Sequence, residues 1–381
     1  MAVKKTAKSK IGGRLNIKGD SFDYQFLVVV YILLLFGLIM VLSASSPSAY
    51  SHYNDSMFYF KRQFMWAVIV TVGMIFFMNF DYRRLGKLAV WFLGISILLL
   101  ILVVIPGVGV ERNNAVRWLG YGAFQFQPSE LAKLAVVLFF AYSLSKNYDV
   151  LSSFWKGLLP YLAIYGLVAL LLMMEPHFSC TMLIGITVVI MLYIAGAKVS
   201  HFGILSIPAV VGIAAMIIQA PYRLKRVVSF LDPFADIQGD GWQIVQSLYA
   251  IGSGSLFGVG LGKSRQKYLY IPEPQNDFIF SIVAEELGLL GVMLVICLFA
   301  FLIIRGIRIA AKAPDLFGTL LAAGITCLIA AQALINIAVV TSSMPVTGMP
   351  LPFFSYGGTA LAITMAEMGI ILNISKQSKA Y

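Results

Sequence analysis

Long apolar runs separated by short polar stretches dominate this chain of 381 residues. A bilayer core about 30 Å thick requires about 20 mostly apolar residues for each helical crossing. About ten runs of that kind fall between charged, proline or glycine residues, which predicts about ten membrane-spanning helices. Their expected ranges are 24–45, 62–80, 87–105, 129–145, 158–174, 178–196, 202–220, 278–304, 317–341 and 353–374.

This pattern predicts an all-α, polytopic membrane protein without a separate soluble domain. We expect a basic cytoplasmic tail at 1–23, a single transmembrane domain at 24–374 and a short cytoplasmic tail at 375–381. The segment 221–277 is too polar to cross a bilayer, so it should form a large extracytoplasmic loop between helices seven and eight. Inside that loop, "GWQIVQSLYAIGSG" has an apolar face at helical spacing, which predicts a helix along the membrane interface.

Composition supports the membrane assignment and excludes other classes. The chain is 60% hydrophobic and 12% charged, against roughly 45–50% apolar residues in ordinary soluble domains. The net charge of +11 is spread over loops instead of forming one basic stripe, so nucleic acid is not an expected partner. Most basic residues of the short loops fall on one side, which places both termini in the cytoplasm and lets those residues contact membrane lipids. The three cysteines have no paired spacing, so neither a disulfide framework nor a metal site is expected.

The stretch "YIPEPQNDFIFSIVAEELG", residues 270–288, gathers four carboxylates: Glu273, Asp277, Glu285 and Glu286. Asn276 or Asp277 is a good N-cap for the eighth helix, so Asp277 should stand at its outer mouth, where the helix dipole favours the ionised form. Glu285 and Glu286 should lie two or more turns deeper and need partners. Lys133 is the one basic residue that falls in the interior of an expected helix, since Arg62 and Lys87 only begin theirs, and the sequence leaves open whether it meets them.

Other polar features lie in or beside the apolar runs. Glu130 and Lys133 in "QPSELAKLAVVLFF" are three residues apart on one helical face, so they can pair, either to ease the helix into the bilayer or to line a wet cavity. Arg117 and Trp118 lie in an outer segment, where they could bind phosphate and sugar or simply anchor helices at the interface. The long loop carries further basic residues that suit either lipid attraction or an anionic headgroup: Arg223, Arg226, Lys263, Arg265 and Lys267.

The stretch "SSMPVTGMPLPFFSYGGTA", residues 342–360, cannot form a regular helix because it contains three prolines and three glycines. Irregular backbone at membrane depth is tolerated only where it is buried in protein or lines a water-filled cavity. Gly357 and Gly358 would allow close approach of a ligand, or merely a tight turn.

These features in this order resemble the SEDS family of bacterial cell-wall proteins, which includes FtsW, SpoVE and RodA. The resemblance covers essentially the whole chain and rests on "NNAVRW", "QPSELAK", "FLDPFAD", "GKSRQKYLYIPEPQNDFIFSIVAEELG" and "MPVTGMPLPFFSYGG". The "PEPQNDFIF" form is closest to the division and sporulation branch of FtsW and SpoVE. Two departures are "EPHFSC" at 175–180, where "QPDLGT" is more usual and which leaves the role of His177 open, and Ser255, where glycine is common.

The resemblance implies a peptidoglycan glycosyltransferase that polymerises lipid II outside the bacterial cytoplasmic membrane, at the septum or during sporulation. It further implies a class B penicillin-binding protein as partner, with other division or sporulation proteins, and it assigns Asp277 as the catalytic candidate. Trp118, Glu130 and Lys133 match the other family motifs. The chemistry fits, because a carboxylate can take a proton from the acceptor hydroxyl while basic residues or a divalent cation (Mg²⁺ or Mn²⁺) meet the leaving diphosphate.

Two other functions remain open at this point. A lipid II flippase would use polar residues within the helices to move the same substrate and would need gates to both leaflets. A non-enzymatic scaffold would recruit the penicillin-binding partner and would tolerate substitution of Asp277.

Overall fold

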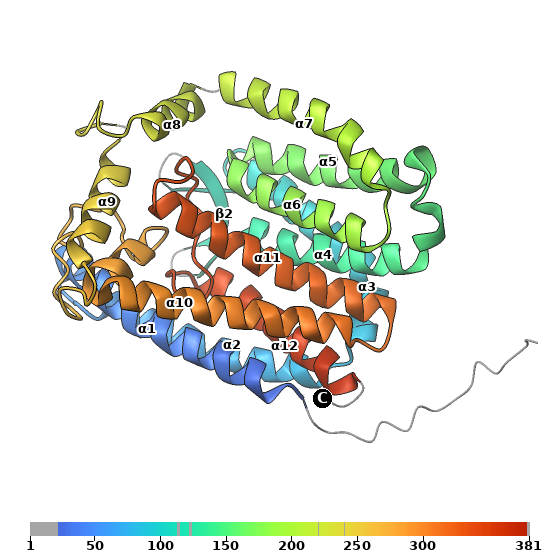
Figure 1. Cartoon of the computed structure of the whole chain (residues 1–381), viewed down its shortest axis with the longest axis horizontal. Helices are drawn as coiled ribbons and strands as arrows, with labels where there is room; N and C mark the ends of the chain where they lie inside the picture. The colour runs from blue at the N-terminus through green and yellow to red at the C-terminus, as the bar shows by residue number, and fades with distance from the viewer. Residues whose placement is uncertain (1–21, 113–114, 122–123, 220, 240, 379–381) are drawn as a thin grey trace, which may run out of the picture.

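The computed structural model describes residues 22–112, 115–121, 124–219, 221–239 and 241–378. Within these residues the chain consists almost wholly of α-helices, and the long helices run side by side (Figure 1). Most of the two expected tails lies outside the described residues, so the division into tails and transmembrane domain stays a prediction.

Nine helices of the described residues are long and apolar enough to cross a membrane, and α6 is a shorter apolar helix of 17 residues. Together they correspond to the ten expected runs, so the all-α polytopic fold is confirmed. The largest shift is at α1, which continues to Tyr53 and ends where Asn54 adopts a left-handed conformation. The bounds are α1 Tyr24–Tyr53, α2 Phe58–Asn79, α3 Tyr82–Val104, α4 Pro128–Lys146, α5 Leu159–Met174, α6 Phe178–Ile194, α7 Val199–Ile218, α10 Ile279–Ala311, α11 Leu316–Val340 and α12 Gly358–Gln377.

The first and last of these helices are joined at one end of the bundle. The backbone N–H of Asp23 donates to Ser375 Oγ at 3.1 Å, and Arg305 pairs with the Asp23 carboxylate. Figure 1 shows the start of α1 and the end of α12 at the same end. We call this the terminal end and the opposite one the distal end.

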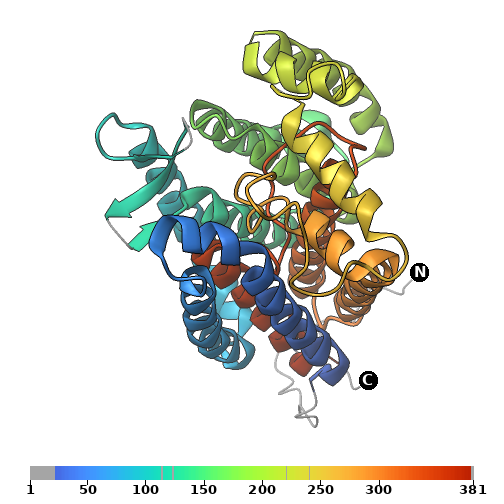
Figure 2. The same cartoon turned by 90° about the vertical axis from the view of Figure 1, so that its left-hand side faces the viewer.

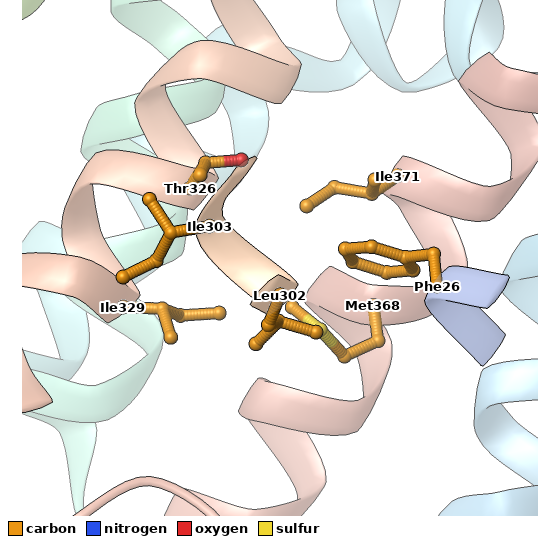
Figure 3. A pocket seen from close by; sticks show the side chains of 7 residues that line it. All are labelled: Phe26, Leu302, Ile303, Thr326, Ile329, Met368 and Ile371. Carbon is orange, nitrogen blue, oxygen red and sulfur yellow. The ribbon is translucent and has the colours of Figure 1, made fainter. Parts of the chain in front are cut away.

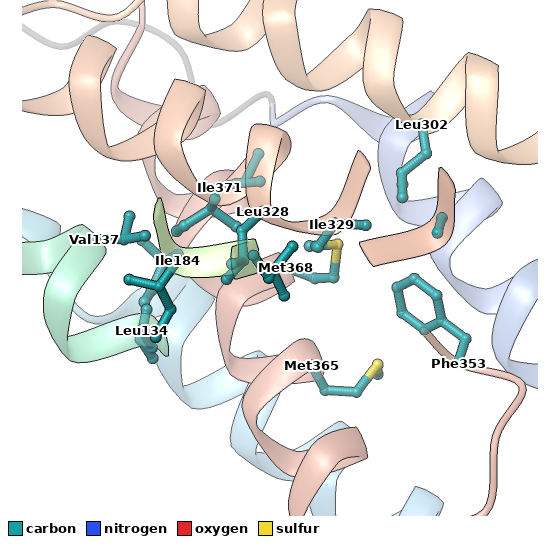
Figure 4. Close-up of a cluster of buried hydrophobic side chains, with 14 of the residues drawn as sticks. Leu134, Val137, Ile184, Leu302, Leu328, Ile329, Phe353, Met365, Met368 and Ile371 are labelled. Atoms are coloured by element: carbon teal, nitrogen blue, oxygen red, sulfur yellow. The ribbon is translucent and has the colours of Figure 1, made fainter. Parts of the chain in front are cut away.

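Apolar side chains from α4, α6, α11 and α12 fill the centre of the bundle. Val137, Ile184, Leu328 and Ile371 lie close together in Figure 4, and each is at most 2% exposed. Helix α7, by contrast, runs along the edge of the molecule and leaves most of its apolar surface open, as expected of a helix that faces lipid (Figure 1). The bundle is therefore packed with apolar side chains at this central level and has an apolar exterior.

The distal end carries the non-helical structure (Figure 2). The expected outer segment before α4 is a small antiparallel sheet with the order β1-β2-β3, formed by Val110–Arg112, Ala115–Tyr121 and Phe124–Phe126. The long loop contains α8, Pro221–Leu231, and α9, Trp242–Gly254, where a helix was expected. Two short turns, a 3₁₀ turn at Tyr148–Val150 and a π turn at Phe154–Leu158, connect α4 to α5 at the terminal end.

Helix α9 packs differently from a helix whose polar residues face solvent. Gln246 is 6% exposed and Ser247 is fully buried. Ser247 Oγ donates to the Val340 carbonyl at the end of α11 over 2.8 Å. The polar side chains of α9 therefore fix it to the bundle.

Candidate functional site

Asp277 lies two residues before α10 and does not cap it. The helix begins at Ile279, and Phe278 occupies the N-cap position without a side-chain hydrogen bond. The expected N-cap at Asn276 or Asp277 is therefore wrong. The side chain of Asn276 instead donates to Glu273 at 2.7 Å, which leaves the Asp277 carboxylate available for another role.

Helix α11 and an irregular segment fix the backbone at Asp277. Asn336 of α11 donates from Nδ2 to the Asp277 carbonyl at 2.7 Å and to the Met349 carbonyl at 2.7 Å. The Gln275 carbonyl accepts from the Tyr356 N–H at 2.8 Å. Since Met349 and Tyr356 belong to the segment between α11 and α12, that segment and the start of α10 are held as one unit.

The segment 341–357 is irregular, as expected from its prolines and glycines. Its carbonyl groups accept hydrogen bonds from three neighbouring elements: from Arg226 to Val346 at 3.1 Å, from Ser179 to Thr347, and from Gln332 to Pro350 at 2.9 Å. We call it the re-entrant segment. Its bonds to α6, α8 and α11 place it among the helices of the distal end.

Gly348 of this segment lies against the Asp277 side chain. Its φ is +65°, and a Cβ atom built on it would lie 3.4 Å from Asp277 Oδ2. A glycine is needed here for its left-handed conformation, and its lack of a side chain leaves space at the carboxylate. Gly348, and not the expected Gly357 or Gly358, is the glycine that lies against this carboxylate.

The residue Asp277 is half-buried, so part of its surface is exposed. Partial burial raises the pKa of its carboxyl, and the negative charge of Glu273 acts in the same direction. A hydrogen bond from its own backbone N–H and the positive charge of Arg226 lower that pKa, but by less. The result is a carboxylate more basic than an ordinary aspartate, which suits proton abstraction.

Glu130 and Lys133 form the expected pair inside the bundle. The Nζ–Oε2 distance is 2.9 Å, and both side chains are about 95% buried. Lys133 also donates to Gln332 Oε1 at 2.8 Å, and Gln332 in turn donates to the re-entrant segment. The pair is therefore linked through one amide to the re-entrant segment, whose Gly348 lies near Asp277.

Arg117 and Trp118 lie on β2 and are half-buried. The guanidinium of Arg117 donates through Nε to the Glu175 carbonyl at 3.2 Å and through Nη2 to the Pro176 carbonyl. The forked group thus fixes the turn between α5 and α6 to the sheet. The sheet is also joined to the start of α12, because Thr359 donates to the Gln125 carbonyl at 3.4 Å.

The two deeper carboxylates do not meet Lys133. Glu286 pairs with Lys267 of the long loop, with an Nζ–Oε1 distance of 2.8 Å, and it also accepts from the hydroxyl of Ser43 on α1. The Lys267 and Glu286 side chains are 4% and 0% exposed. Because this buried pair occupies the ammonium of Lys267, we no longer include that residue among the groups that could contact a substrate.

Glu285 accepts hydrogen bonds from the long loop. Its carboxylate accepts from the N–H of Arg265 at 2.8 Å, from the N–H of Gln266 at 3.4 Å and from the hydroxyl of Ser264. The backbone carbonyls of Glu285 and Glu286 accept from the N–H groups of Val259 and Gly260 at 3.0 Å each. These carboxylates therefore attach the long loop to α10.

The remaining basic candidates occupy different positions. Arg223 donates to the Met216 carbonyl at 2.9 Å and lies 5.5 Å from the Phe178 ring centre. Arg226, Lys263 and Arg265 are exposed at the distal end. Of these, Arg226 is electrostatically coupled to Asp277.

The cavity at the centre of Figure 3 is a packing gap and not a substrate site. Six apolar side chains and Thr326 line it, and the Thr326 hydroxyl already donates to the Ala322 carbonyl. Its lining residues belong to α1, α10, α11 and α12, and none is among the residues that surround Asp277. Among the described residues, no group of three or more His, Cys, Asp or Glu side chains is placed to hold a metal ion.

Sequence reasoning missed Gln332 and Asn336, which connect the parts of the site. Both are buried amides of α11. The available signal was their polarity, because "LIAAQALINIAVV" is otherwise apolar and an amide in such a run needs a partner. Their four-residue spacing places them on one helical face.

The fold and this site define a multi-pass helical membrane protein in which a carboxylate is fixed beside an irregular re-entrant segment. The sequence model of the family described as cell cycle protein, which covers FtsW, RodA and SpoVE, matches residues 24–380. The chain therefore belongs to this family, and the SEDS assignment made from the motifs is confirmed.

Individual relatives agree over nearly the full length. The chain is 45% identical to stage V sporulation protein E of Bacillus subtilis over 366 residues, covering 96% of this chain and 100% of that protein. It is 41% identical to a probable peptidoglycan glycosyltransferase FtsW of Trichlorobacter lovleyi over 357 residues, 93% of each chain.

Solved structures show the same fold. One chain comes from a study of the structural coordination of polymerization and crosslinking by a peptidoglycan synthase complex. It superposes with a TM-score of 0.77 at 30% identity and covers 94% of this chain and 98% of its own. The rod shape determining protein RodA of Thermus thermophilus superposes with a TM-score of 0.69 at 28% identity, covering 95% and 99%.

Proposed function

We propose that this chain is a peptidoglycan glycosyltransferase that polymerises lipid II into β-1,4-linked glycan strands, with Asp277 as general base. The observation that carries the proposal is the position of Asp277: half-buried, free of any capping role, and held by Asn336 and the re-entrant segment at the distal end. The family membership and the names of its relatives support it.

The reaction joins two lipid-linked disaccharides. The Asp277 carboxylate takes the proton of the acceptor GlcNAc 4-hydroxyl, and that oxygen forms a bond to the anomeric carbon of the donor MurNAc. The bond from this carbon to the diphosphate oxygen breaks, and its electron pair leaves with the polyprenyl diphosphate. Attack from the opposite face inverts the α-linked donor to a β linkage, and a positioned base contributes typically 10²- to 10⁴-fold in rate.

The leaving diphosphate needs positive charge. Arg226, Lys263 and Arg265 are exposed basic residues of the long loop, and Arg223 lies in the same loop. These residues, with Arg117 and Trp118 on the sheet and the Glu130–Lys133 pair behind the re-entrant segment, form the substrate site that we propose. A Mg²⁺ or Mn²⁺ ion could add charge by binding the substrate's own phosphate oxygens, because such ions usually keep several water ligands and need few protein groups.

The proposed function also implies partner proteins and an orientation in the membrane. A class B penicillin-binding protein would cross-link the product, and the structural similarity to a chain of a peptidoglycan synthase complex supports such a partner. We place both termini in the cytoplasm and the distal end outside the bacterial cytoplasmic membrane, at the septum or in sporulation, together with other division or sporulation proteins.

The test is polymerisation of purified lipid II by the full chain, with and without a class B partner and a divalent cation, scored as glycan polymer on a gel. We expect Asp277→Asn to abolish polymer, because an amide cannot accept the proton. Full activity of a folded Asp277→Asn protein would reject the proposal. Transfer of labelled lipid II between leaflets without polymer would favour a flippase, and unchanged function in all Asp277 variants would favour a scaffold.

A further inference from the structure

Four polar side chains around the turn between α5 and α6 lack hydrogen-bond partners. Among the described residues, both carboxyl oxygens of Glu175, Nδ1 of His177, and the hydroxyls of Ser129 and Thr347 are buried without a partner. Glu175, His177 and Ser129 are 1%, 6% and 0% exposed as residues. We call these four residues the α5–α6 polar cluster.

The elements that carry the cluster are in direct contact. Cys180 at the start of α6 donates to the Ser129 carbonyl at the start of α4 over 3.9 Å, and Ser179 donates to the Thr347 carbonyl of the re-entrant segment. Arg117 fixes the turn itself through the carbonyls of Glu175 and Pro176. Thr347 precedes Gly348, which lies against Asp277, so the cluster adjoins the proposed base.

Buried polar groups without hydrogen-bond partners destabilise a folded protein. A buried polar group without a partner costs about 1–3 kcal/mol, and nearly all such groups in native proteins are paired. Here five side-chain atoms on α4, on the turn between α5 and α6 and on the re-entrant segment are unpaired, while the backbone carbonyls of Ser129, Glu175 and Thr347 accept hydrogen bonds from neighbouring elements. This arrangement indicates side chains that take their partners from a ligand.

The protonation states of the cluster indicate which chemical groups of a ligand it could bind. Burial raises the pKa of Glu175 to about 8, although Arg117 opposes this, and burial with Arg117 and Lys133 lowers the pKa of His177 to about 3. At neutral pH the cluster therefore presents mainly uncharged donors and acceptors. Uncharged groups suit sugar hydroxyls and acetamido groups, whereas a diphosphate requires cations.

We propose that Ser129, Glu175, His177 and Thr347 bind the hydroxyl and acetamido groups of a sugar of the lipid-linked substrate next to Asp277. Thr347, which belongs to the cluster, and its neighbour Gly348 are only half-buried. The cluster therefore extends to a partly exposed part of the re-entrant segment. The inference rests on the proposed function, because it assigns the sugar part of that substrate to named side chains.

Two probes separate the sugar from the rest of the substrate: lipid II and undecaprenyl diphosphate, which has the lipid and the diphosphate but no sugar. Binding of each is measured with the full chain in nanodiscs, in an Asp277→Asn background so that lipid II is not consumed. Glu175→Leu, His177→Phe and Thr347→Val should each weaken lipid II binding roughly 10-fold and leave undecaprenyl diphosphate binding unchanged. Glu111→Leu, which alters an exposed carboxylate on β1, is the matched control and should change neither.

Thr347→Val keeps the side-chain shape, so it tests the proposal even if Glu175→Leu fails to fold. Equal loss for both probes, or no loss for either, would overturn the assignment to sugar. So would a Mn²⁺-induced rise in the melting temperature that Glu175→Leu removes, because the cluster would then hold a cation. None of these results depends on the polymerisation assay, so failure of the subsite and failure of the proposed function can be told apart.

Discussion

Gly348 lies directly beside the Asp277 carboxylate: a Cβ atom on Gly348 would be in van der Waals contact with Asp277 Oδ2, at 3.4 Å. The glycine has a φ of +65°, which L side chains rarely adopt. The relationship joins two segments about 70 residues apart in sequence and makes the re-entrant segment one wall of the proposed catalytic site.

We predict that Gly348→Ala lowers lipid II polymerisation at least 10-fold while costing only about 1–2 kcal/mol of stability. The left-handed backbone disfavours alanine by roughly that amount, and relaxation of the segment would move the wall of the site. Initial rates and melting temperatures of purified protein provide the measurement. Gly73→Ala in α2, where a Cβ meets nothing within 4 Å, is the control. Wild-type rates for Gly348→Ala would contradict the proposed geometry.

The pH dependence of polymerisation should report the Asp277 carboxyl. The base acts in its ionised form, so kcat/KM should fall as pH falls through the pKa of Asp277, and this should occur at a higher pH than for an ordinary aspartate. Glu273→Gln should move the acidic limb to lower pH, because the charge of Glu273 raises that pKa. Arg226→Gln should move it to higher pH, because Arg226 lowers the pKa. Shifts in the opposite directions would reject the assignment.

The buried pair of Lys267 and Glu286 should matter for stability. Lys267→Met leaves the Glu286 carboxylate without a cation in a site that is 0% exposed, which should cost about 3–5 kcal/mol. Thermal unfolding in detergent measures the loss. Lys263→Met, at an exposed position of the same loop, should have little effect. The double variant Lys267→Met with Glu286→Leu should recover most of the stability, since no unpaired charge then remains; no recovery would argue against this reading.

Asn336 should act as a positioning residue. Asn336→Ala removes the donor shared by the Asp277 and Met349 carbonyls, both at 2.7 Å. We expect kcat to fall 10- to 100-fold with a small change in KM, because the base is displaced while the substrate contacts persist. Steady-state kinetics with purified lipid II separate the two parameters. Asn79→Ala, at an exposed amide of α2 that donates to the Ile75 carbonyl and accepts from Lys376 at the end of α12, far from Asp277 in the bundle, should leave both parameters unchanged.

Features that depend on local sequence were predictable. The membrane helices follow from the length of the apolar runs, and the pairing of Glu130 with Lys133 follows from a three-residue spacing on one helix. The irregularity of the re-entrant segment follows from its prolines and glycines. In each case the neighbours that decide the structure are within a few residues.

Features that depend on tertiary contacts were not predictable. The sequence favoured Asn276 or Asp277 as a helix cap, but Asn276 bonds to Glu273 and the carbonyl of Asp277 is held by a residue of α11. Lys267 reaches Glu286 through the long loop, which folds back onto α10 with Leu256 and Gly258 packed against Gly288, whose φ of +66° interrupts the helix. The three short strands before α4 show too little alternation of apolar and polar residues to be distinguished from a loop.

The hydrogen bond between Asp23 and Ser375 holds the start of α1 beside the end of α12, which favours circular permutation of the chain. Because the polypeptide begins and ends its bundle at one place, a short linker could close it there, and the chain could be reopened at the exposed stretch 147–150 between α4 and α5. Such a circular permutant would keep both new ends on the side of the old ones and the order of helices in space unaltered. The arrangement of the bundle would then be independent of the order in which the ribosome delivers its helices.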